Sequence, residues 1–151
     1  MKHFKKEDTI MLLIDHQVGT LNFAVSRPKE MIVNRAKALA MIARDLHIPV
    51  VLTSSQEDHM QGRLIPELEE ILPAEYEARI KRTGVTNAWD DENYKKAVIE
   101  AAKGRKNVIM AGLTNDAAAH FGSFAHFASM DINASSEKTR EALAWHQQSW
   151  G

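Results

Sequence analysis

The chain has 151 residues, of which 44% are hydrophobic and 26% charged, and its net charge is -1 with neutral histidines. This composition is typical of one globular domain, expected to span residues 1–151, and the charge balance gives no electrostatic footprint for nucleic acid or anionic membrane. Cysteine is absent, which excludes disulfides, thiolate metal sites and cysteine nucleophiles. No apolar run approaches the ~20 residues that span a bilayer. Charges among residues 2–8 interrupt any signal-peptide core, so we expect a soluble, cytoplasmic protein.

Strands and helices are predicted to alternate along the chain. Apolar runs over 9–14, 48–53 and 107–111 are typical of strands buried on both faces, and a brief strand is expected over 77–81. Apolar spacing and punctuation predict helices over 31–46, 66–72 and 91–103, with Pro73 ending the second and Asp90 capping the third. A turn at 112–115 opens a further helix. This order predicts an α/β fold, a doubly wound three-layer α/β/α domain with a mostly parallel sheet.

Polar residues follow the predicted strands. They are Asp15, residues 54–57, Lys81 and residues 114–116. Ligands in parallel α/β sheets bind beyond the carboxyl ends of the strands, so these residues mark a candidate site. Asp15 beside a cation, Lys81 first and Arg82 next, would make a general base next to a group that stabilises negative charge. On these residues alone, a structural ion pair is the alternative.

Four segments of the chain resemble, in order and spacing, the isochorismatase-like cysteine hydrolases and most closely their YcaC-type branch. The segments are Leu-Leu-Ile-Asp-His-Gln at 12–17, Val-Leu-Thr-Ser-Ser-Gln-Glu at 51–57, Ile-Lys-Arg-Thr-Gly-Val-Thr-Asn-Ala-Trp-Asp-Asp at 80–91 and Met-Ala-Gly-Leu-Thr-Asn-Asp at 110–116. The resemblance covers roughly the first 116 residues. Residues 117–151 diverge and are shorter than the family pattern, so we expect the last strand of the sheet to be short or missing.

The resemblance implies a cofactor-free hydrolase of small amides or related substrates that assembles as a homo-oligomer. It assigns the aspartate base to Asp15, the lysine to Lys81 and the cysteine position to Ala118, with backbone amides nearby as the oxyanion hole. Because alanine has no nucleophile, we expect activity to be lost or strongly reduced. The alternative is a non-catalytic small-molecule-binding or oligomeric scaffold protein. A substitute hydroxyl nucleophile would be needed for a working enzyme, and no serine or threonine near the site is marked as activated.

The resemblance also implies residues that would line the pocket. The predicted substrate-binding residues are Gln17, Gln56, Glu57, Asn87, Trp89, Leu113 and Thr114. Their alternative reading is a polar loop and a capped helix start with a packed aromatic ring. The seven histidines show no shared ligand spacing: His120 and His126 are six residues apart, and Asp58 and His59 are adjacent. We therefore expect no metal and no cofactor, and as partners only a small molecule and further copies of the chain.

Overall fold

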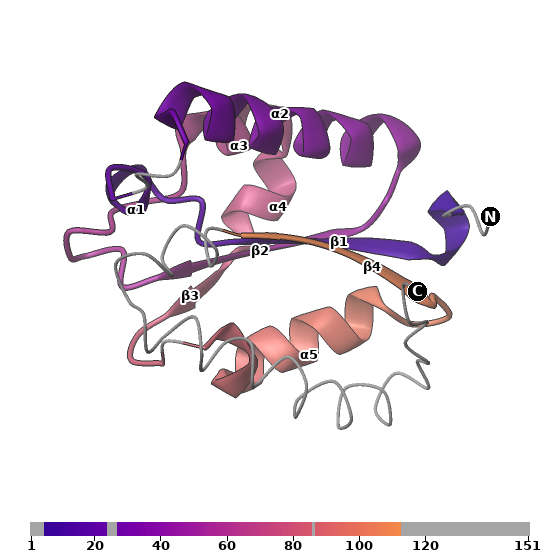
Figure 1. Ribbon diagram of the computed structural model, residues 1–151. Helices are drawn as coiled ribbons and strands as arrows, with labels where there is room; N and C mark the ends of the chain where they lie inside the picture. Colours follow the sequence, from indigo (N-terminus) through magenta and orange to yellow (C-terminus); the bar gives the residue numbers. More distant parts are fainter. Residues whose placement is uncertain (1–4, 24–26, 86, 113–151) are drawn as a thin grey trace, which may run out of the picture.

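The computed structural model describes residues 5–23, 27–85 and 87–112. Four parallel strands form a sheet in the order β3-β2-β1-β4, as Figure 1 shows. Their bounds are Thr9–Ile14 for β1, Val50–Ser55 for β2, Ile80–Arg82 for β3 and Asn107–Gly112 for β4. Because the strands are parallel, their carboxyl ends meet at one edge of the sheet.

Helices cover both faces of this sheet. One face carries α2 (Lys29–Leu46), α3 (Pro66–Ile71) and α4 (Pro73–Glu77), and α5 (Glu92–Ala101) lies on the other (Figure 1). The short α1 (Val18–Leu21) follows β1, and single 3-10 turns precede β1 and α5 at Lys6–Asp8 and Ala88–Asp90. The predicted α/β class, with helices on both sides of a parallel sheet, is confirmed.

The central strand β1 supplies apolar side chains to both layers. Met11 and Leu13 pack with α2, α3 and α4, whereas Ile10 and Leu12 pack with α5, and none of the four is more than 3% exposed. Side chains alternate between the two faces of a strand, so an unbroken apolar run is what a strand with a helix on each face requires. The run over 9–14 therefore predicted both the strand and its burial.

Element boundaries differ from the prediction at several places. The strand predicted over 48–53 is β2, so Ser54 and Ser55 belong to the strand instead of following it, and α1 was not predicted. Pro73 begins α4 instead of simply following a helix, because the first helical position needs no backbone N–H donor. Asp91, not Asp90, caps α5, and its Oδ1 accepts from the backbone N of Tyr94 at 2.9 Å. The strand expected over 77–81 is confined to β3, because Glu77 still belongs to α4.

Several predictions fall outside the described residues. These are the helix after residue 112, the position of Ala118 and the short or missing last strand. Within the described ranges, no helix has the length and apolar character needed to cross a membrane.

The turn of α1 packs against the loop that follows β2. The backbone N of Gly19 donates to the carbonyl of Gln61 at 2.8 Å, and a Cβ built on Gly19 would lie 1.7 Å from the carbonyl oxygen of Met60. Only glycine allows so close an approach of two backbones. The loop over 56–62 is therefore held directly against the segment that follows β1.

The two-sided burial of β1 predicts a large cost for truncating one of its side chains. Leu13→Ala should lower the free energy of unfolding by about 2–5 kcal/mol, because it removes buried contacts and leaves a cavity. Urea denaturation followed by circular dichroism measures this loss. Ile42→Ala, on the exposed side of α2 at 47% exposure, is the control and should stay within about 1 kcal/mol of the parent. Equal losses in the two variants would contradict the assignment of the core.

Candidate functional site at the carboxyl ends of the strands

Asp15 is the first residue after β1 and takes a left-handed backbone conformation, with φ of 59°. Its backbone N donates to the carbonyl of Thr53 at 3.0 Å, so it still pairs with β2 while the chain turns away from the sheet. Aspartate tolerates this conformation better than most residues. Its side chain is 24% exposed, which leaves the carboxylate at the rim of the core.

The carboxylate of Asp15 forms an ion pair with the buried guanidinium of Arg82, at the end of β3. The same guanidinium donates from Nε to the hydroxyl of Thr53 at 3.1 Å and from Nη1 to the carbonyl of Val85 at 3.2 Å. Burial raises the pKa of the Asp15 carboxyl, and the charge and hydrogen bond of Arg82 offset part of that rise. The pair thus combines a carboxylate of increased basicity with a fixed positive charge.

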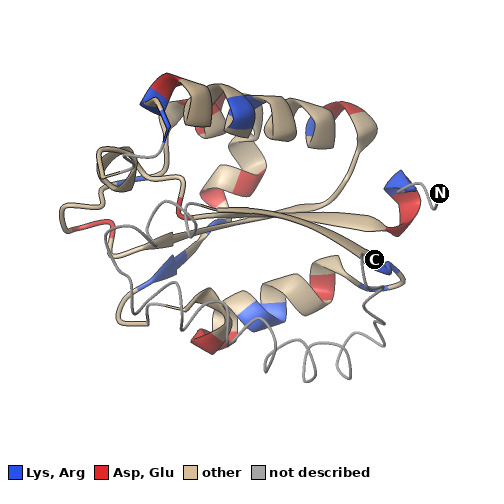
Figure 2. Ribbon diagram, in the orientation of Figure 1, with Lys and Arg blue, Asp and Glu red and all other residues tan. Residues whose placement is uncertain are grey.

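Lys81 does not take the place beside Asp15 that the sequence suggested. It is exposed, while Arg82 is only 1% exposed, because neighbouring residues of a strand point to opposite faces. Figure 2 shows β3 in the blue of Lys and Arg, because Lys81 and Arg82 are adjacent in this strand. The charge of Lys81 acts instead on Glu57. The expectation that Lys81 is the first cation for Asp15 is therefore corrected in favour of Arg82.

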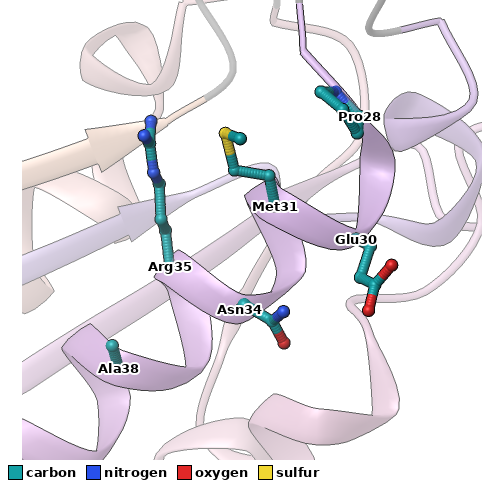
Figure 3. Close-up of a pocket in the computed structure, with 6 residues that line it drawn as sticks. All are labelled: Pro28, Glu30, Met31, Asn34, Arg35 and Ala38. Carbon is teal, nitrogen blue, oxygen red and sulfur yellow. The ribbon is translucent and has the colours of Figure 1, made fainter.

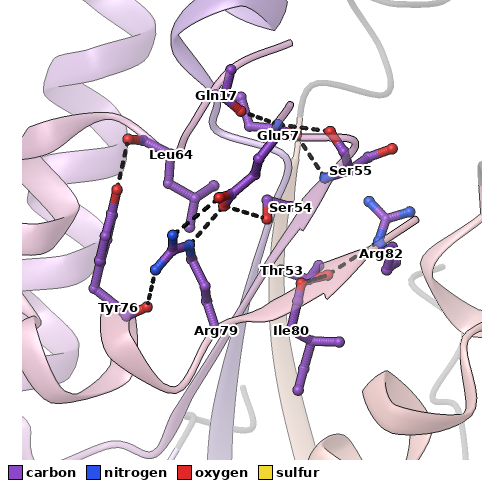
Figure 4. Close-up of polar contacts among 11 residues, drawn as sticks. Gln17, Thr53, Ser54, Ser55, Glu57, Leu64, Tyr76, Arg79, Ile80 and Arg82 are labelled. Carbon is purple, nitrogen blue, oxygen red and sulfur yellow. Dashed lines mark hydrogen bonds and ion pairs between the residues drawn. The ribbon is translucent and has the colours of Figure 1, made fainter. Parts of the chain in front are cut away.

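A second ion pair joins the loop after β2 to the residue before β3 (Figure 4). Arg79 donates to both carboxylate oxygens of Glu57, at 2.7 and 3.0 Å, and the hydroxyl of Ser54 donates to the same carboxylate at 2.7 Å. Burial works to raise the pKa of Glu57, but these hydrogen bonds and the charges of Arg79 and Lys81 outweigh it, so the pKa is lowered. The predicted pocket residue Glu57 has both oxygens engaged within the protein.

Gln17 is fully buried, and its amide links three backbone segments (Figure 4). The Nε2 group donates to the carbonyls of Ser55 at 2.8 Å and Gly62 at 2.5 Å, and Oε1 accepts from the backbone N of Ser55 at 2.9 Å. Both amide hydrogens are thereby used. The structure places Gln17 as a clamp between β1, β2 and the 56–62 loop, with no donor left for a ligand.

The other predicted pocket residues are distributed around the same edge. Gln56 has φ of 46° and its backbone N donates to the carbonyl of Arg82 at 2.9 Å, so it lies beside the ion pair. Asn87 caps the 3-10 turn before α5 by accepting from the backbone N of Trp89 at 3.1 Å. Trp89 is half-buried. Leu113, Thr114 and Ala118 lie outside the described residues.

His16 is 4% exposed, and its Nδ1 has no hydrogen-bond partner within the described ranges. Burial lowers the pKa of its imidazole to about 4, so the ring is neutral at physiological pH. The imidazole therefore adds no positive charge beside Asp15 at neutral pH.

An open hollow of about 510 Å³ lies along the first turns of α2 (Figure 3). It is lined by Pro28, Glu30, Met31, Asn34, Arg35 and Ala38. None of these residues was predicted for the site. In the part of the chain that the structure describes, no three His, Asp or Glu side chains converge as metal ligands.

Sequence patterns placed Arg82 second to Lys81 as the partner of Asp15, and they did not predict the pairing of Glu57 with Arg79. The alternation of β3 contains the signal for Arg82, since Ile80 packs on the α5 side and Arg82, two residues later, shares that face. The pairing of Glu57 with Arg79 has no local signal, because the two residues are 22 positions apart and meet only through the loop.

The fold and the ion pair define an α/β protein with a carboxylate and a cation at the carboxyl ends of a parallel sheet. Solved structures share this fold, among them two YcaC proteins. YcaC from Pseudomonas aeruginosa, with hexane-2,5-diol and covalent acrylamide, has a TM-score of 0.68 and 40% identity over 74% of this chain and 54% of its own. YcaC from Escherichia coli, an octameric hydrolase of unknown specificity, has a TM-score of 0.64 and 33% identity over 75% and 55%.

The curated "Probable hydrolase YcaC" of Escherichia coli K12 is 36% identical over 116 residues, which is 77% of this chain and 54% of that protein. The chain is therefore a homologue of the YcaC hydrolases, and the predicted relationship to the YcaC-type branch is confirmed over the matched residues. The chain spans about half the length of the relatives it matches. No protein-family model matches it.

The contrast between Arg82 and Lys81 predicts very different costs for two adjacent truncations. Arg82→Ala should lower the free energy of unfolding by about 3–5 kcal/mol, because it leaves the Asp15 carboxylate without its partner at the edge of the core. Lys81→Ala, the exposed neighbour, should change it by about 0.5 kcal/mol or less. Urea denaturation at pH 7 measures both. A loss at Lys81 as large as that at Arg82 would contradict the assignment of the ion pair.

The buried His16 predicts a fall in stability on acidification. Between pH 6.5 and about 4 the unfolded chain binds a proton at this position and the folded chain does not, so unfolding becomes easier as the pH falls. The expected loss across this interval is about 3 kcal/mol, since each pKa unit corresponds to about 1.4 kcal/mol. His16→Gln should flatten the profile, and His59→Gln, which changes an exposed histidine, should not. Urea midpoints at a series of pH values provide the test.

Proposed function

We propose that this chain is a YcaC-type hydrolase homologue that keeps a small-molecule site around Asp15 but has lost the cysteine nucleophile, so that hydrolysis is absent or strongly reduced. The observation that carries the proposal is the Asp15 carboxylate, partly exposed at the carboxyl ends of the strands and held by the buried Arg82. Homology to a probable hydrolase supports the class of site, and the absence of cysteine from all 151 residues supports the loss of turnover.

In this proposal each residue of the ion pair has a separate role. In the family reaction, the aspartate removes the proton of the thiol, and a neighbouring cation favours the thiolate and the charged intermediate. Asp15 would supply the base. Arg82 would supply the positive charge that the resemblance assigned to Lys81. Ala118 stands at the cysteine position and offers neither a proton nor a nucleophile.

Small amides are the ligand class that we propose. The Pseudomonas relative carries covalent acrylamide, which is a small neutral amide with an electrophilic double bond. A carboxylate beside a guanidinium can accept from an amide N–H while the cation faces the carbonyl oxygen. A ligand of this kind needs no metal or cofactor for recognition.

Restoring the cysteine tests this proposal directly. Ala118→Cys should react with acrylamide at pH 7 about tenfold faster than an ordinary exposed thiol, because a neighbouring base and cation lower the thiol pKa from about 8.5. Intact-mass spectrometry over time measures the single adduct. Met60→Cys, at a residue 71% exposed, is the matched control with one unassisted thiol. Adding Asp15→Asn to Ala118→Cys should return the rate to that of the control.

An Ala118→Cys thiol no faster than the Met60→Cys control would overturn the assignment of position 118 to the lost nucleophile. The unmodified chain should also hydrolyse none of a broad panel of small amides and esters. Turnover that disappears in Asp15→Asn would contradict the loss of activity and would favour a hydroxyl nucleophile in place of the cysteine.

A non-catalytic oligomeric scaffold is the second candidate. The observation that favours it is the octameric assembly of the Escherichia coli relative, combined with the alanine at position 118 of this chain. Light scattering during size-exclusion chromatography would then give a defined homo-oligomer without turnover. A monomer would exclude the scaffold and leave small-molecule binding as the function.

A further inference from the structure

Tyr94 is a second polar group at this edge of the sheet, and the site described so far does not use it. Tyr94 is 2% exposed, and its hydroxyl has no hydrogen-bond partner among residues 5–23, 27–85 and 87–112. A buried hydroxyl without a partner costs free energy that a phenylalanine of the same shape would avoid. Such a group in a well-packed core indicates an acceptor that arrives from outside the packed side chains.

The ring of Tyr94 is held firmly, so its hydroxyl has a fixed position. Its backbone N donates to Asp91 at the start of α5, and its ring packs edge-on against Trp89, with 6.3 Å between centroids and 89° between planes. Tyr94 also belongs to the apolar cluster that includes Ile14 and Ile80. Ile14 directly precedes Asp15, and Ile80 lies two residues before Arg82 in β3, so the cluster contacts the strand residues next to the ion pair in the chain.

The charges of the ion pair reach the hydroxyl of Tyr94. Burial raises the pKa of this hydroxyl, Arg82 opposes the rise and Asp15 adds to it. Both charged groups therefore lie near the phenol, although neither accepts or donates a hydrogen bond to it within the described ranges. At neutral pH the hydroxyl is protonated and can donate.

We propose that Tyr94 is a ligand-binding residue of the Asp15 site, whose hydroxyl donates a hydrogen bond to the carbonyl oxygen of a bound small amide. The inference rests on the proposed function, because it takes the amide class from there. It adds a specificity element: Tyr94 would supply an uncharged donor to the carbonyl oxygen, and Asp15 would accept from the amide nitrogen. A hydrocarbon or an amine of equal size would leave the Tyr94 hydroxyl unpaired.

Binding of propionamide, the saturated analogue of acrylamide, tests this inference on the unmodified chain. Titration followed by ¹H–¹⁵N NMR gives the Kd, and Tyr94→Phe should weaken it about tenfold, as expected for the loss of one buried hydrogen bond. Tyr76→Phe is the matched control, because that tyrosine is equally buried but its hydroxyl already donates to the carbonyl of Leu64 at 3.3 Å. It should leave the Kd unchanged.

Stability separates a binding role from a structural one. Tyr94→Phe should leave the urea midpoint unchanged or raise it, since it removes an unpaired hydroxyl, whereas Tyr76→Phe should lower it by losing a hydrogen bond. A lower midpoint with an unchanged Kd in Tyr94→Phe would overturn the inference, as would an unmodified chain that binds no propionamide.

The inference and the proposed function fail in different ways. A reactive Ala118→Cys thiol together with an unchanged propionamide Kd in Tyr94→Phe would overturn the role of Tyr94 alone. An unreactive Ala118→Cys thiol together with the tenfold weaker Kd would overturn the assignment of the lost nucleophile and leave Tyr94 in its role.

Discussion

The guanidinium of Arg82 is the group on which the arrangement of the strand ends depends. A positive charge buried to 1% exposure is unfavourable unless polar groups surround it, and Asp15, Thr53 and Val85 supply them from three different segments. Through this one side chain, the ends of β1, β2 and β3 are brought to fixed relative positions. The same charge keeps a carboxylate available at the rim of the core, so stability and the candidate chemistry share one interaction.

Polar residues at the ends of parallel strands serve two purposes in this protein. Gln17 donates hydrogen bonds to Ser55 and Gly62, and Glu57 accepts from Arg79. These bonds hold the 56–62 loop against the strand ends. Asp15 remains partly exposed, and the hydroxyl of Tyr94, in the α5 layer, has no hydrogen-bond partner among the described residues. A position at a strand end therefore makes a residue a candidate for the site. Its role there depends on whether its polar atoms are already hydrogen-bonded within the protein.

Much of this architecture is readable from the sequence because burial on both faces leaves an unbroken apolar run. That rule found β1, and an apolar run of the same kind marked β4, although within the described residues β4 is only partly buried. The spacing of apolar residues found α2, α3 and α5. It could not find α4, since Pro73 is equally compatible with a helix stop and a helix start. The choice between Lys81 and Arg82 depends on which face of a three-residue strand is buried, and the pair of Glu57 and Arg79 depends on the path of a loop. The first follows from strand alternation only once the buried face of β3 is known, and the second is set by tertiary packing alone.

The contact at Gly19 limits how the chain can vary over evolutionary time. Any side chain at this position would meet the carbonyl oxygen of Met60, so α1 and the 56–62 loop can stay in contact only while glycine is kept. A homologue with another residue here must have separated the two segments. That separation would also shift the turn that carries Asp15 and Gln17. Glycine at position 19 is therefore a simple marker, in a newly sequenced relative, of whether the edge of the sheet is built in the same way.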